Sequence, residues 1–534
     1  MQEILLLCLS LILSVSFLVV LAKKLRVAYP IFLVIAGLAI SFIPGIPAIT
    51  INPELVFMII LPPVLYDGAQ NTSWKSLWKW RRIIIVLALG FVLLTAGAVA
   101  WVSVLLIPGF TLAQGFLLGA IISPPDAAAA TSVLQFTKLP KGMVSILEGE
   151  SLLNDASSLV IFRFALVAII SSSFTWYNAA GGFVLVTISG LAIGLLLGFV
   201  FYAIYRWLPT NSNLDIAFSI VLPYIIYLAA ESVHSSGVLA VVSGGLFISY
   251  KNHYVLSHSS RLKSNAVWPS VVFILNAVVF FLIGLQLPGI IKGIQAVSLG
   301  EAFRIAFIIT AVVVVVRLIA AQLSSLFTVF ISKYITVAQS KPGWRNPLVL
   351  GWTGMRGVVS LASALSIPLM LHGQAFPNRN LILFITFMVI IVTLVVQGFT
   401  LPFVIKWVKP DGVGNEKSDE QQLLEIEMQL HTVAAQKLSS VYAADLDEND
   451  ILRNKLELFK FKMELYGSVA DDETKRAGAN AMTQRFKEVM MEVIEHERCR
   501  LHSFRKDDGY DDDVIRIIEN RLDLEEERLQ EESE

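Results

Sequence analysis

Several polar side chains lie close together in a stretch of the chain that is otherwise apolar enough to cross a membrane. Residues 143–172 contain Glu150, Ser151, Asn154 and Asp155. Ionisable groups inside a bilayer are costly and usually face a partner or a water-filled cavity. Ser151 and Asp155 are four residues apart, so both lie on one side of a helix. Because hard cations prefer oxygen ligands, this carboxylate and hydroxyl predict a site for Na⁺, at which a proton could compete for Asp155.

Two other apolar stretches are interrupted near their middle. Residues 112–136 contain Pro124, Pro125 and Asp126 in succession, and residues 347–372 contain the run GWTGMRG. Consecutive prolines remove helical N–H donors, and three glycines within seven residues make a helix easy to unwind. We therefore expect both helices to be broken. The breaks would free backbone carbonyls at Pro124 and Pro125 as further cation ligands.

The two breaks occupy matching places in the chain. Thirteen apolar stretches can be counted, and the breaks fall in the fifth and the twelfth. When stretches 1 to 6 are taken as one unit and 8 to 13 as another, each break lies in the fifth helix of its unit. An offset of seven spans reverses direction through the bilayer, so the units are predicted to be inverted repeats, and paired broken helices in such repeats indicate a transporter site. At a rise of about 1.5 Å per residue, Asp126, Asp155 and Arg356 lie near the middle of a hydrocarbon core about 30 Å thick and could be neighbours.

The composition places most of the chain in a bilayer. Of its 534 residues 55% are hydrophobic, and the mean hydropathy is +0.69, which is far above that of an ordinary soluble domain. The expected fold is therefore all-α and polytopic. The expected membrane spans are residues 3–22, 27–44, 53–68, 82–107, 112–136, 143–172, 178–206, 213–231, 235–250, 266–288, 300–332, 347–372 and 379–405.

Basic residues predict the orientation of these spans. They gather in alternate loops, beginning with Lys23, Lys24 and Arg26 after the first span and ending with Lys406 and Lys409 after the last. Positive loops stay in the cytoplasm. We therefore expect a multi-pass protein of the plasma membrane with its N-terminus outside and its C-terminus in the cytoplasm.

The chain is predicted to have two domains. Residues 1–408 form the transmembrane domain, and residues 409–534 form a charged cytoplasmic tail with helical spacing of its apolar residues. The tail is interpreted as a helix bundle or coiled-coil association module, with a sensor for an unknown ligand or regulator as the alternative. The net charge of −1 gives no indication of nucleic-acid binding, and no cofactor is predicted.

Asp155 has a structural alternative to ion binding. It could be the ion-pair partner of an arginine within the spans, and Arg163, Arg317 and Arg356 are all available. Ion binding is favoured because Asp155 lies among small polar residues, and Glu150 is interpreted as the ion-pair partner of Arg356.

Two further carboxylates are open to a structural reading. Asp126 stands at a helix break, where a carboxylate can satisfy free N–H donors and a positive helix end, and this structural role is favoured. Asp67, near the inner end of the third span, could shape a cytoplasmic funnel or could simply end the span.

Other classes of membrane protein fit the pattern less well. No histidine lies deep in a span and no Gly-x-Ser-x-Gly motif is present, which argues against an enzyme. A channel would not need paired inverted breaks together with a titratable acid at membrane depth. A cation channel and a membrane sensor stay as alternatives.

Four segments together resemble a known family. They are residues 123–131 (SPPDAAAAT), 147–157 (LEGESLLNDAS), 231–246 (ESVHSSGVLAVVSGGL) and 351–360 (GWTGMRGVVS). In order and in membrane depth they are similar to the monovalent cation/proton antiporter family, which includes bacterial Na⁺/H⁺ antiporters and animal Na⁺/H⁺ exchangers. The resemblance spans nearly all of residues 1–408 and does not reach the tail.

The resemblance implies a secondary active antiporter that exchanges Na⁺, or alternatively Li⁺ or K⁺, for H⁺ by alternating access, in pH and sodium homeostasis. It implies a homodimer of thirteen-helix subunits, in which a core domain moves against a dimerisation domain. It also implies that Asp155 is the substrate carboxylate, that Ser151 is a cation ligand, and that Glu150 and Arg356 form a structural pair.

The same resemblance assigns the residues around the breaks. It implies that Asn154 and Asp126 organise the crossing of the broken helices, and the Asn154–Asp155 pairing is associated with electroneutral exchange. The chain departs from the family in two places. Pro125 stands where many relatives have threonine, so only backbone oxygens are available there, and Asp67 stands where bacterial relatives often have glutamate.

Overall fold

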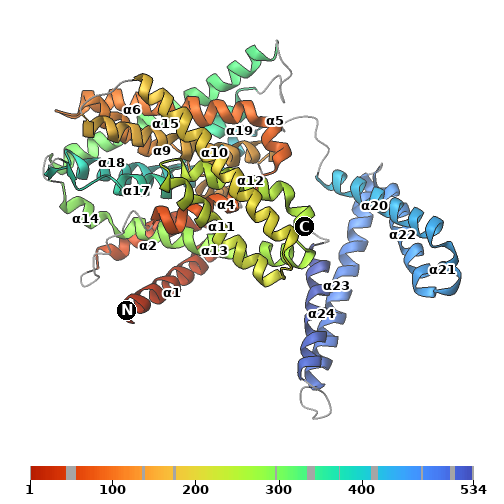
Figure 1. Cartoon of the computed structure of the whole chain (residues 1–534). Helices are drawn as coiled ribbons and strands as arrows, with labels where there is room; N and C mark the ends of the chain where they lie inside the picture. The colour runs from red at the N-terminus through yellow and green to blue at the C-terminus, as the bar shows by residue number, and fades with distance from the viewer. Residues whose placement is uncertain are drawn as a thin grey trace. The chain divides into compact units, whose positions relative to one another are not determined.

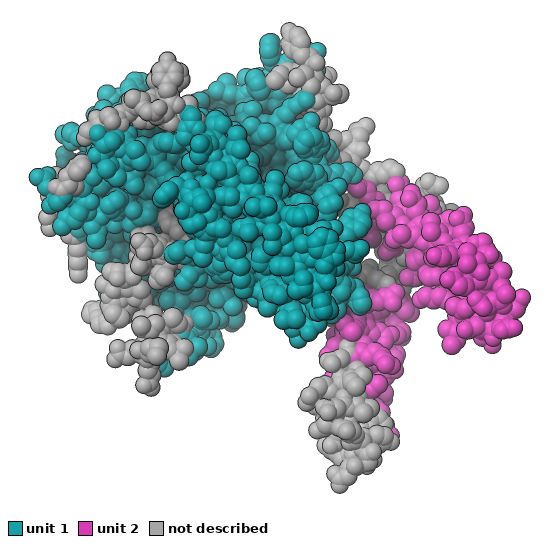
Figure 2. Space-filling view, in the orientation of Figure 1, with its two compact units in different colours: residues 1–414 teal, residues 415–534 magenta. Residues whose placement is uncertain are grey.

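Helices account for nearly all of the regular structure in this computed structural model of the chain (Figure 1). The structure describes residues 2–43, 56–134, 137, 139–171, 176–294, 297–333, 343–371, 373–410, 419–470, 473–504 and 512–531. Two compact units are present, Met1–Gly414 and Asn415–Glu534 (Figure 2). The strands among the described residues are β1 (Met370–Leu371) and β2 (Gln374–Ala375), which pair antiparallel with Met370 opposite Ala375.

Helical segments lie in each of the thirteen ranges predicted to span the membrane. The helices without a break or a π-helical turn are α1 (Gln2–Leu25), α2 (Tyr29–Ser41), α9 (Lys141–Ser171), α10 (Trp176–Trp207), α11 (Ser212–Ser232), α12 (Gly237–Val255), α13 (His258–Leu285) and α15 (Leu299–Ile331). The segmented ones are η1 (Val56–Ile60) with α4 (Leu61–Asn71), α5 (Trp74–Ile85) with η2 (Val86–Phe91) and α6 (Val92–Leu106), α7 (Leu112–Ile122) with α8 (Ala127–Leu134), α16 (Arg345–Trp352) with α17 (Val358–Leu365), and α18 (Arg379–Val392) with η3 (Thr393–Gln397) and α19 (Gly398–Val408). A short helix, α14 (Leu287–Lys292), precedes α15.

Among the described residues, eight helices are long and apolar enough to cross a membrane. They cover Trp74–Leu106, Leu112–Leu134, Lys141–Ser171, Gly181–Trp207, Ser212–Ser232, His258–Leu285, Leu299–Phe330 and Arg379–Val408. The chain is therefore a multi-pass membrane protein.

Both predicted helix breaks are present. The first separates α7 from α8, because α7 ends at Ile122 and α8 begins only at Ala127. The second separates α16 from α17, because α16 ends at Trp352 and α17 begins at Val358. The prediction of broken helices in the fifth and twelfth ranges is confirmed.

The helix of the fourth range begins about two turns before the range itself. The fourth span was expected to begin at residue 82, but the helix begins with α5 at Trp74 and continues into the apolar part. The Ser73 hydroxyl caps it by accepting a hydrogen bond from the Ser76 N–H at 3.3 Å. The first turns carry tryptophans and basic residues, which suit a membrane interface, so the helix continues beyond the hydrocarbon region.

The apolar packing of the first unit forms two clusters. One cluster is built mainly from α4, α10, α11 and α12, which pack side by side. The other joins α2, α5 to α9, α13 and α15 to α19. Helix α9 contributes to both, since Leu152 and Ala156 belong to the first cluster while Leu147 and Phe162 belong to the second. Asp155 therefore lies on the helix that borders both groups.

Helices α6 and α7 pack at unusually close range through small residues. A methyl group added to Gly119 of α7 would lie 2.5 Å from the carbonyl oxygen of Ala96, and one added to Gly115 would lie 2.7 Å from that of Ala100. Small residues at such spacing let backbones approach closely within a membrane. This contact fixes the helix that leads into the first break.

The second unit is also helical. It contains α20 (Asp419–Val441), α21 (Ala443–Glu448), α22 (Asp450–Ala470), α23 (Glu473–Phe504) and α24 (Asp512–Glu531). Helix α20 packs on α22, and α23 packs on α24. Arg498 of α23 joins the latter pair by contacting Asp523 at 2.8 Å and Glu526 at 2.6 Å.

The close contact of α6 and α7 gives a stability prediction. Gly119→Ala should lower the free energy of unfolding by about 1–3 kcal/mol, because the new methyl group overpacks the contact with Ala96. Gly97→Ala is the matched control, since nothing lies within 4 Å of a methyl group there and alanine favours a helix. Thermal unfolding in detergent measures both. Equal melting temperatures for Gly119→Ala and wild type would contradict the prediction.

Candidate cation-binding site

The two helix breaks touch each other through their backbones. The N–H of Asp126, in the first break, donates a hydrogen bond of 2.7 Å to the carbonyl of Met355, in the second. The Asp126 carboxylate accepts hydrogen bonds from the N–H groups of Ala128 at 2.9 Å and Ala129 at 3.3 Å, at the start of α8. It also lies against Gly357, just before α17, where any side chain would collide with it. Asp126 therefore lies at the positive ends of two helices, where a carboxylate offsets the partial charge.

Arg356 binds the carbonyl groups at the negative ends of two helices. It is fully buried, and its Nε donates to the carbonyl of Ile122, the last residue of α7, at 3.1 Å. Its Nη1 donates to the carbonyl of Gly354, just after α16. A cation at a helix C-terminus satisfies free carbonyls and offsets the partial negative charge.

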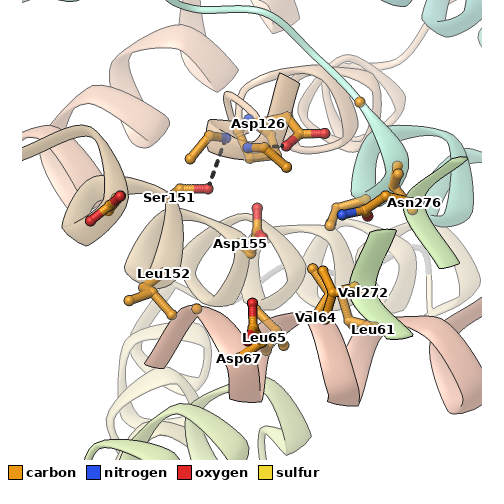
Figure 3. Close-up of a pocket in the computed structure, with 18 of the residues that line it drawn as sticks. Leu61, Val64, Leu65, Asp67, Asp126, Ser151, Leu152, Asp155, Val272 and Asn276 are labelled. Carbon is orange, nitrogen blue, oxygen red and sulfur yellow. Dashed lines mark hydrogen bonds between the residues drawn. The ribbon is translucent and has the colours of Figure 1, made fainter. Parts of the chain in front are cut away.

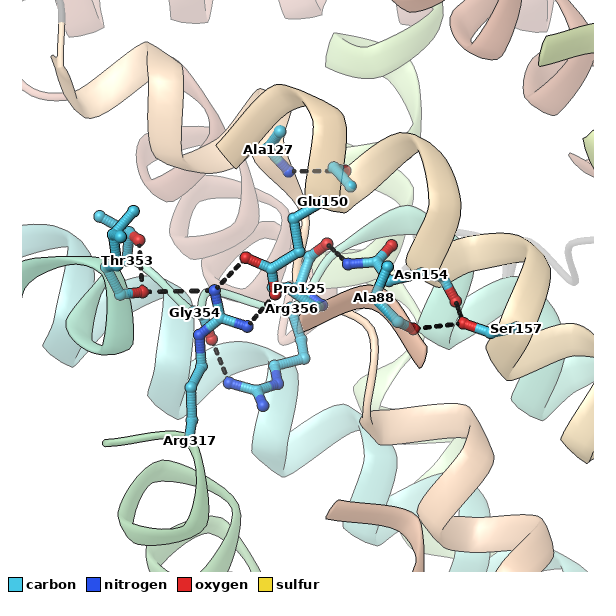
Figure 4. Close-up of polar contacts among 12 residues, drawn as sticks. Ala88, Pro125, Ala127, Glu150, Asn154, Ser157, Arg317, Thr353, Gly354 and Arg356 are labelled. Atoms are coloured by element: carbon cyan, nitrogen blue, oxygen red, sulfur yellow. Dashed lines mark hydrogen bonds and ion pairs between the residues drawn. The ribbon is translucent and has the colours of Figure 1, made fainter. Parts of the chain in front are cut away.

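The predicted Glu150–Arg356 ion pair is wrong in its partner. Glu150 instead accepts two hydrogen bonds from Arg317 of α15, at 2.8 and 3.2 Å, and both side chains are buried (Figure 4). Arg317 also lies over the ring of Phe91, with 5.2 Å between its guanidinium carbon and the ring centroid. The physical reason is that the breaks expose carbonyl groups that engage Arg356, which leaves Arg317 to neutralise Glu150.

Two side chains of α9 attach that helix to the first break. The Asn154 amide donates to the carbonyl of Pro125 at 3.2 Å, and the Ser151 hydroxyl accepts from the Ala127 N–H at 3.2 Å (Figures 3 and 4). The Pro125 carbonyl, predicted as a cation ligand, is thus already an acceptor for Asn154. These bonds set the position of the next turn of α9.

Asp155 faces a cavity of about 240 Å³ (Figure 3). Only 8% of the residue is exposed, and within the described part of the chain no donor hydrogen-bonds to its carboxylate. Asp67, Asp126 and Ser151 line the same cavity, as does Pro125. A buried and unpaired carboxylate is costly, so the site is suited to a proton or a cation.

Three of the other predicted site residues lie behind the cavity wall. Glu150, Asn154 and Arg356 do not line the cavity; they support the helices that do. Asp67 lines it from α4 and accepts a hydrogen bond from the Asn71 amide at 3.0 Å.

Glu148 and Asn276 also line the cavity, and neither was assigned a role from the sequence. Glu148 lies two helical turns before Asp155 on the same face of α9, and this spacing was the signal for it. Asn276 reaches the cavity from α13. Its signal was a single amide between two apolar runs of a predicted span, which indicates a cavity or a partner.

A second cavity, of about 370 Å³, lies near the other end of α9. Arg163 of α9 contacts Glu231 of α11 there, with Nη2 2.7 and 2.5 Å from the two carboxylate oxygens. Glu231 also accepts a hydrogen bond from the Gly237 N–H at 3.2 Å. The pair links the two groups of helices that pack on either side of α9.

Two broken helices meet inside a membrane bundle, beside a carboxylate that no described residue pairs with, and this combination is typical of an ion transporter. Residues 10–407 match the family model described as "Sodium/hydrogen exchanger, transmembrane". The chain therefore belongs to the sodium/hydrogen exchanger family. The proteins of this family are transporters and not enzymes.

Individual relatives agree with this assignment. A protein of Mycobacterium tuberculosis named as an uncharacterized Na⁺/H⁺ exchanger is 31% identical over 523 residues, 96% of this chain and 93% of its own length. A Bacillus subtilis protein named as a sodium, potassium, lithium and rubidium/H⁺ antiporter is 36% identical over 375 residues, 68% of this chain and 56% of its own length. The solved structure of the sodium proton antiporter MjNhaP1 from Methanocaldococcus jannaschii has the same fold, with a TM-score of 0.60 and 18% identity, covering 76% of this chain and 99% of that one.

The ion pair behind the site gives a second prediction. Glu150→Ala or Arg317→Ala should each lower the free energy of unfolding by about 3–5 kcal/mol, because either change leaves a buried charge without its partner. The double variant Glu150→Leu with Arg317→Met should recover most of the loss, since it removes both charges. Chemical unfolding in detergent distinguishes these cases. A double variant as unstable as either single variant would contradict the assignment.

Proposed function

We propose that this protein exchanges Na⁺ for H⁺ across the membrane, with Asp155 as the group that binds either ion. The observation that carries the proposal is the carboxylate of Asp155, which is buried, has no partner among the residues that the structure describes and faces a cavity beside the crossed breaks. Family membership supports the same activity. Ser151, with its hydroxyl in the same cavity, is proposed as a cation ligand.

Exchange follows from competition for one carboxylate. A proton or a monovalent cation each neutralises Asp155, whereas the empty site keeps a charge that is costly to carry through the bilayer. If only the loaded forms move, each Na⁺ that crosses is matched by a proton in the other direction. One-for-one exchange is electroneutral, so a membrane potential, which contributes about 2.3 kcal/mol per charge per 100 mV, does not drive it.

The cavity at Asp155 is proposed to open to the cytoplasm. Asn71 and Thr72 line it at the end of α4, directly before the basic segment of α5. Under the rule that positive segments stay inside, this end faces the cytoplasm, the N-terminus lies outside and the C-terminus inside. The protein would then be in an inward-facing state. The proposal also places it in the plasma membrane, with its thirteen spans containing two inverted six-helix repeats.

The pair of Arg163 and Glu231 is proposed to close the outer side in this state. Alternating access requires α9 to shift against α11, which separates the two side chains. Because they are 42% and 30% exposed, the pair contributes about 1 kcal/mol or less, which is weak enough to break in each cycle.

Cation range and assembly are part of the same proposal. The name of the Bacillus subtilis relative includes potassium, lithium and rubidium, so K⁺ and Li⁺ are the alternative substrates to test beside Na⁺. We propose a homodimer, with the unit Asn415–Glu534 serving regulation or dimerisation.

The central residue gives a direct test. Asp155→Asn should abolish exchange in proteoliposomes. The amide does not take up a proton, and it has no negative charge with which to bind a cation. Asp67→Asn is the matched control; it lines the same cavity but is hydrogen-bonded to Asn71, so exchange should persist with at most a modest rise in KM. Dissipation of a pH gradient on adding Na⁺, Li⁺ or K⁺ reports the activity. Exchange by a well-folded Asp155→Asn protein would refute the proposal.

The outer ion pair gives another test. With Ser366→Cys as a reporter in the outer cavity, Arg163→Gln should raise the rate of labelling by an impermeant maleimide from outside. The increase should be about fivefold at most, the equivalent of the 1 kcal/mol that such a pair contributes. Glu301→Gln, at the start of α15, is the control and should leave the rate unchanged. An unchanged rate in Arg163→Gln would show that the pair does not close the outer side.

A further inference from the structure

Asn276 is a buried amide without a hydrogen-bond partner among the described residues. It is 5% exposed, lies in an otherwise apolar part of α13, and lines the cavity that Asp155 faces. Leaving a buried amide unpaired costs about 1–3 kcal/mol. The side chain is therefore suited to bind a group within the cavity.

The amide comes from a different wall than the other polar groups of the cavity. Asp155 and Ser151 belong to α9 and Asp126 to the break before α8, whereas Asn276 belongs to α13 (Figure 3). Val272, one turn earlier on α13, lines the same cavity. A cation at Asp155 would therefore have polar groups on two sides.

The position of Asn276 is fixed by close packing of its helix. Helix α13 packs along α2, and a methyl group added to Gly284 would lie 2.6 Å from the backbone nitrogen of Leu38. Two helices in backbone contact leave little freedom for sliding. The amide is thus presented to the cavity by a rigid support.

The oxygens on the α9 side are partly occupied already. The Pro125 carbonyl accepts from Asn154, and the Ser151 hydroxyl accepts from Ala127. Asp155 can offer two carboxylate oxygens, which is few for a hard cation that has shed part of its water. A further neutral oxygen on the opposite wall would complete the set without changing its charge.

We propose that the amide oxygen of Asn276 is a direct ligand of the transported cation, working together with Asp155. The assignment rests on the proposed exchange function. Because the amide is neutral, the cation-loaded site keeps the same net charge as the proton-loaded site. Asn276 therefore affects how tightly the cation binds and leaves proton binding to Asp155.

The test compares two substitutions of nearly equal size in proteoliposomes. Asn276→Leu removes the oxygen and should raise the KM for Na⁺ at least tenfold, with the maximal rate within about threefold of wild type. Asn276→Asp keeps an oxygen at the same place and should hold KM within about threefold of wild type. Ser270→Ala is the control, because Ser270 is an exposed residue of the same helix whose hydroxyl is bonded to Ala266 at 3.2 Å; its KM should not change.

Thermal stability of the purified protein measures Na⁺ binding without transport, so the result does not depend on turnover. The rise in melting temperature on adding Na⁺ to purified protein should be lost in Asn276→Leu and kept in Asn276→Asp, while the melting temperature without cation reports folding. Unchanged KM and unchanged Na⁺ stabilisation in Asn276→Leu would overturn the assignment, and so would equal losses in both variants, which would indicate a need for the intact amide rather than for its oxygen. Absence of any exchange by wild type would instead refute the proposed function.

Discussion

The arrangement of the site depends on how the ends of four half-helices are neutralised inside the membrane. Broken helices leave N–H and C=O groups without partners, and in a bilayer no water replaces them. Here each break contains one charged residue that neutralises helix ends at the crossing. Asp126 takes the N–H groups at the start of α8 and lies at the start of α17, and Arg356 takes the carbonyl at the end of α7. Opposite charges at opposite helix ends allow both breaks to lie at membrane depth.

The same arrangement explains why the Asp155 carboxylate has no partner in the described part of the chain. The arginines near it have other partners, since Arg356 binds carbonyls and Arg317 binds Glu150. Asn154 and Ser151 attach α9 to the first break, and this attachment positions Asp155 in the wall of the cavity. With both arginines bound to other groups, an ion from solution is left to neutralise this carboxylate.

Much of this could be predicted from sequence, for identifiable reasons. The length and composition of the apolar stretches predicted where helices lie, and prolines and glycines predicted both breaks, because these are local properties of the chain. The partner of Glu150 could not be predicted, since three arginines were equally available by depth and the choice of Arg317 depends on which helices pack together. Asn276 was missed for the same reason, because its distance from α9 along the chain hides a shared cavity. The start of α5 before residue 82 could not be predicted, because hydropathy marks the hydrocarbon region and not the end of the helix.

We propose that a cation and a proton compete for the carboxylate of Asp155, and proton release on cation binding would reveal this competition. Purified protein in weakly buffered detergent solution is mixed with Na⁺ while a pH indicator reports free protons and calorimetry reports bound cation. The account predicts release of about one proton per cation bound when the site begins protonated, and none from Asp155→Asn. Saturable Na⁺ binding without proton release across the pH range in which exchange occurs would contradict it.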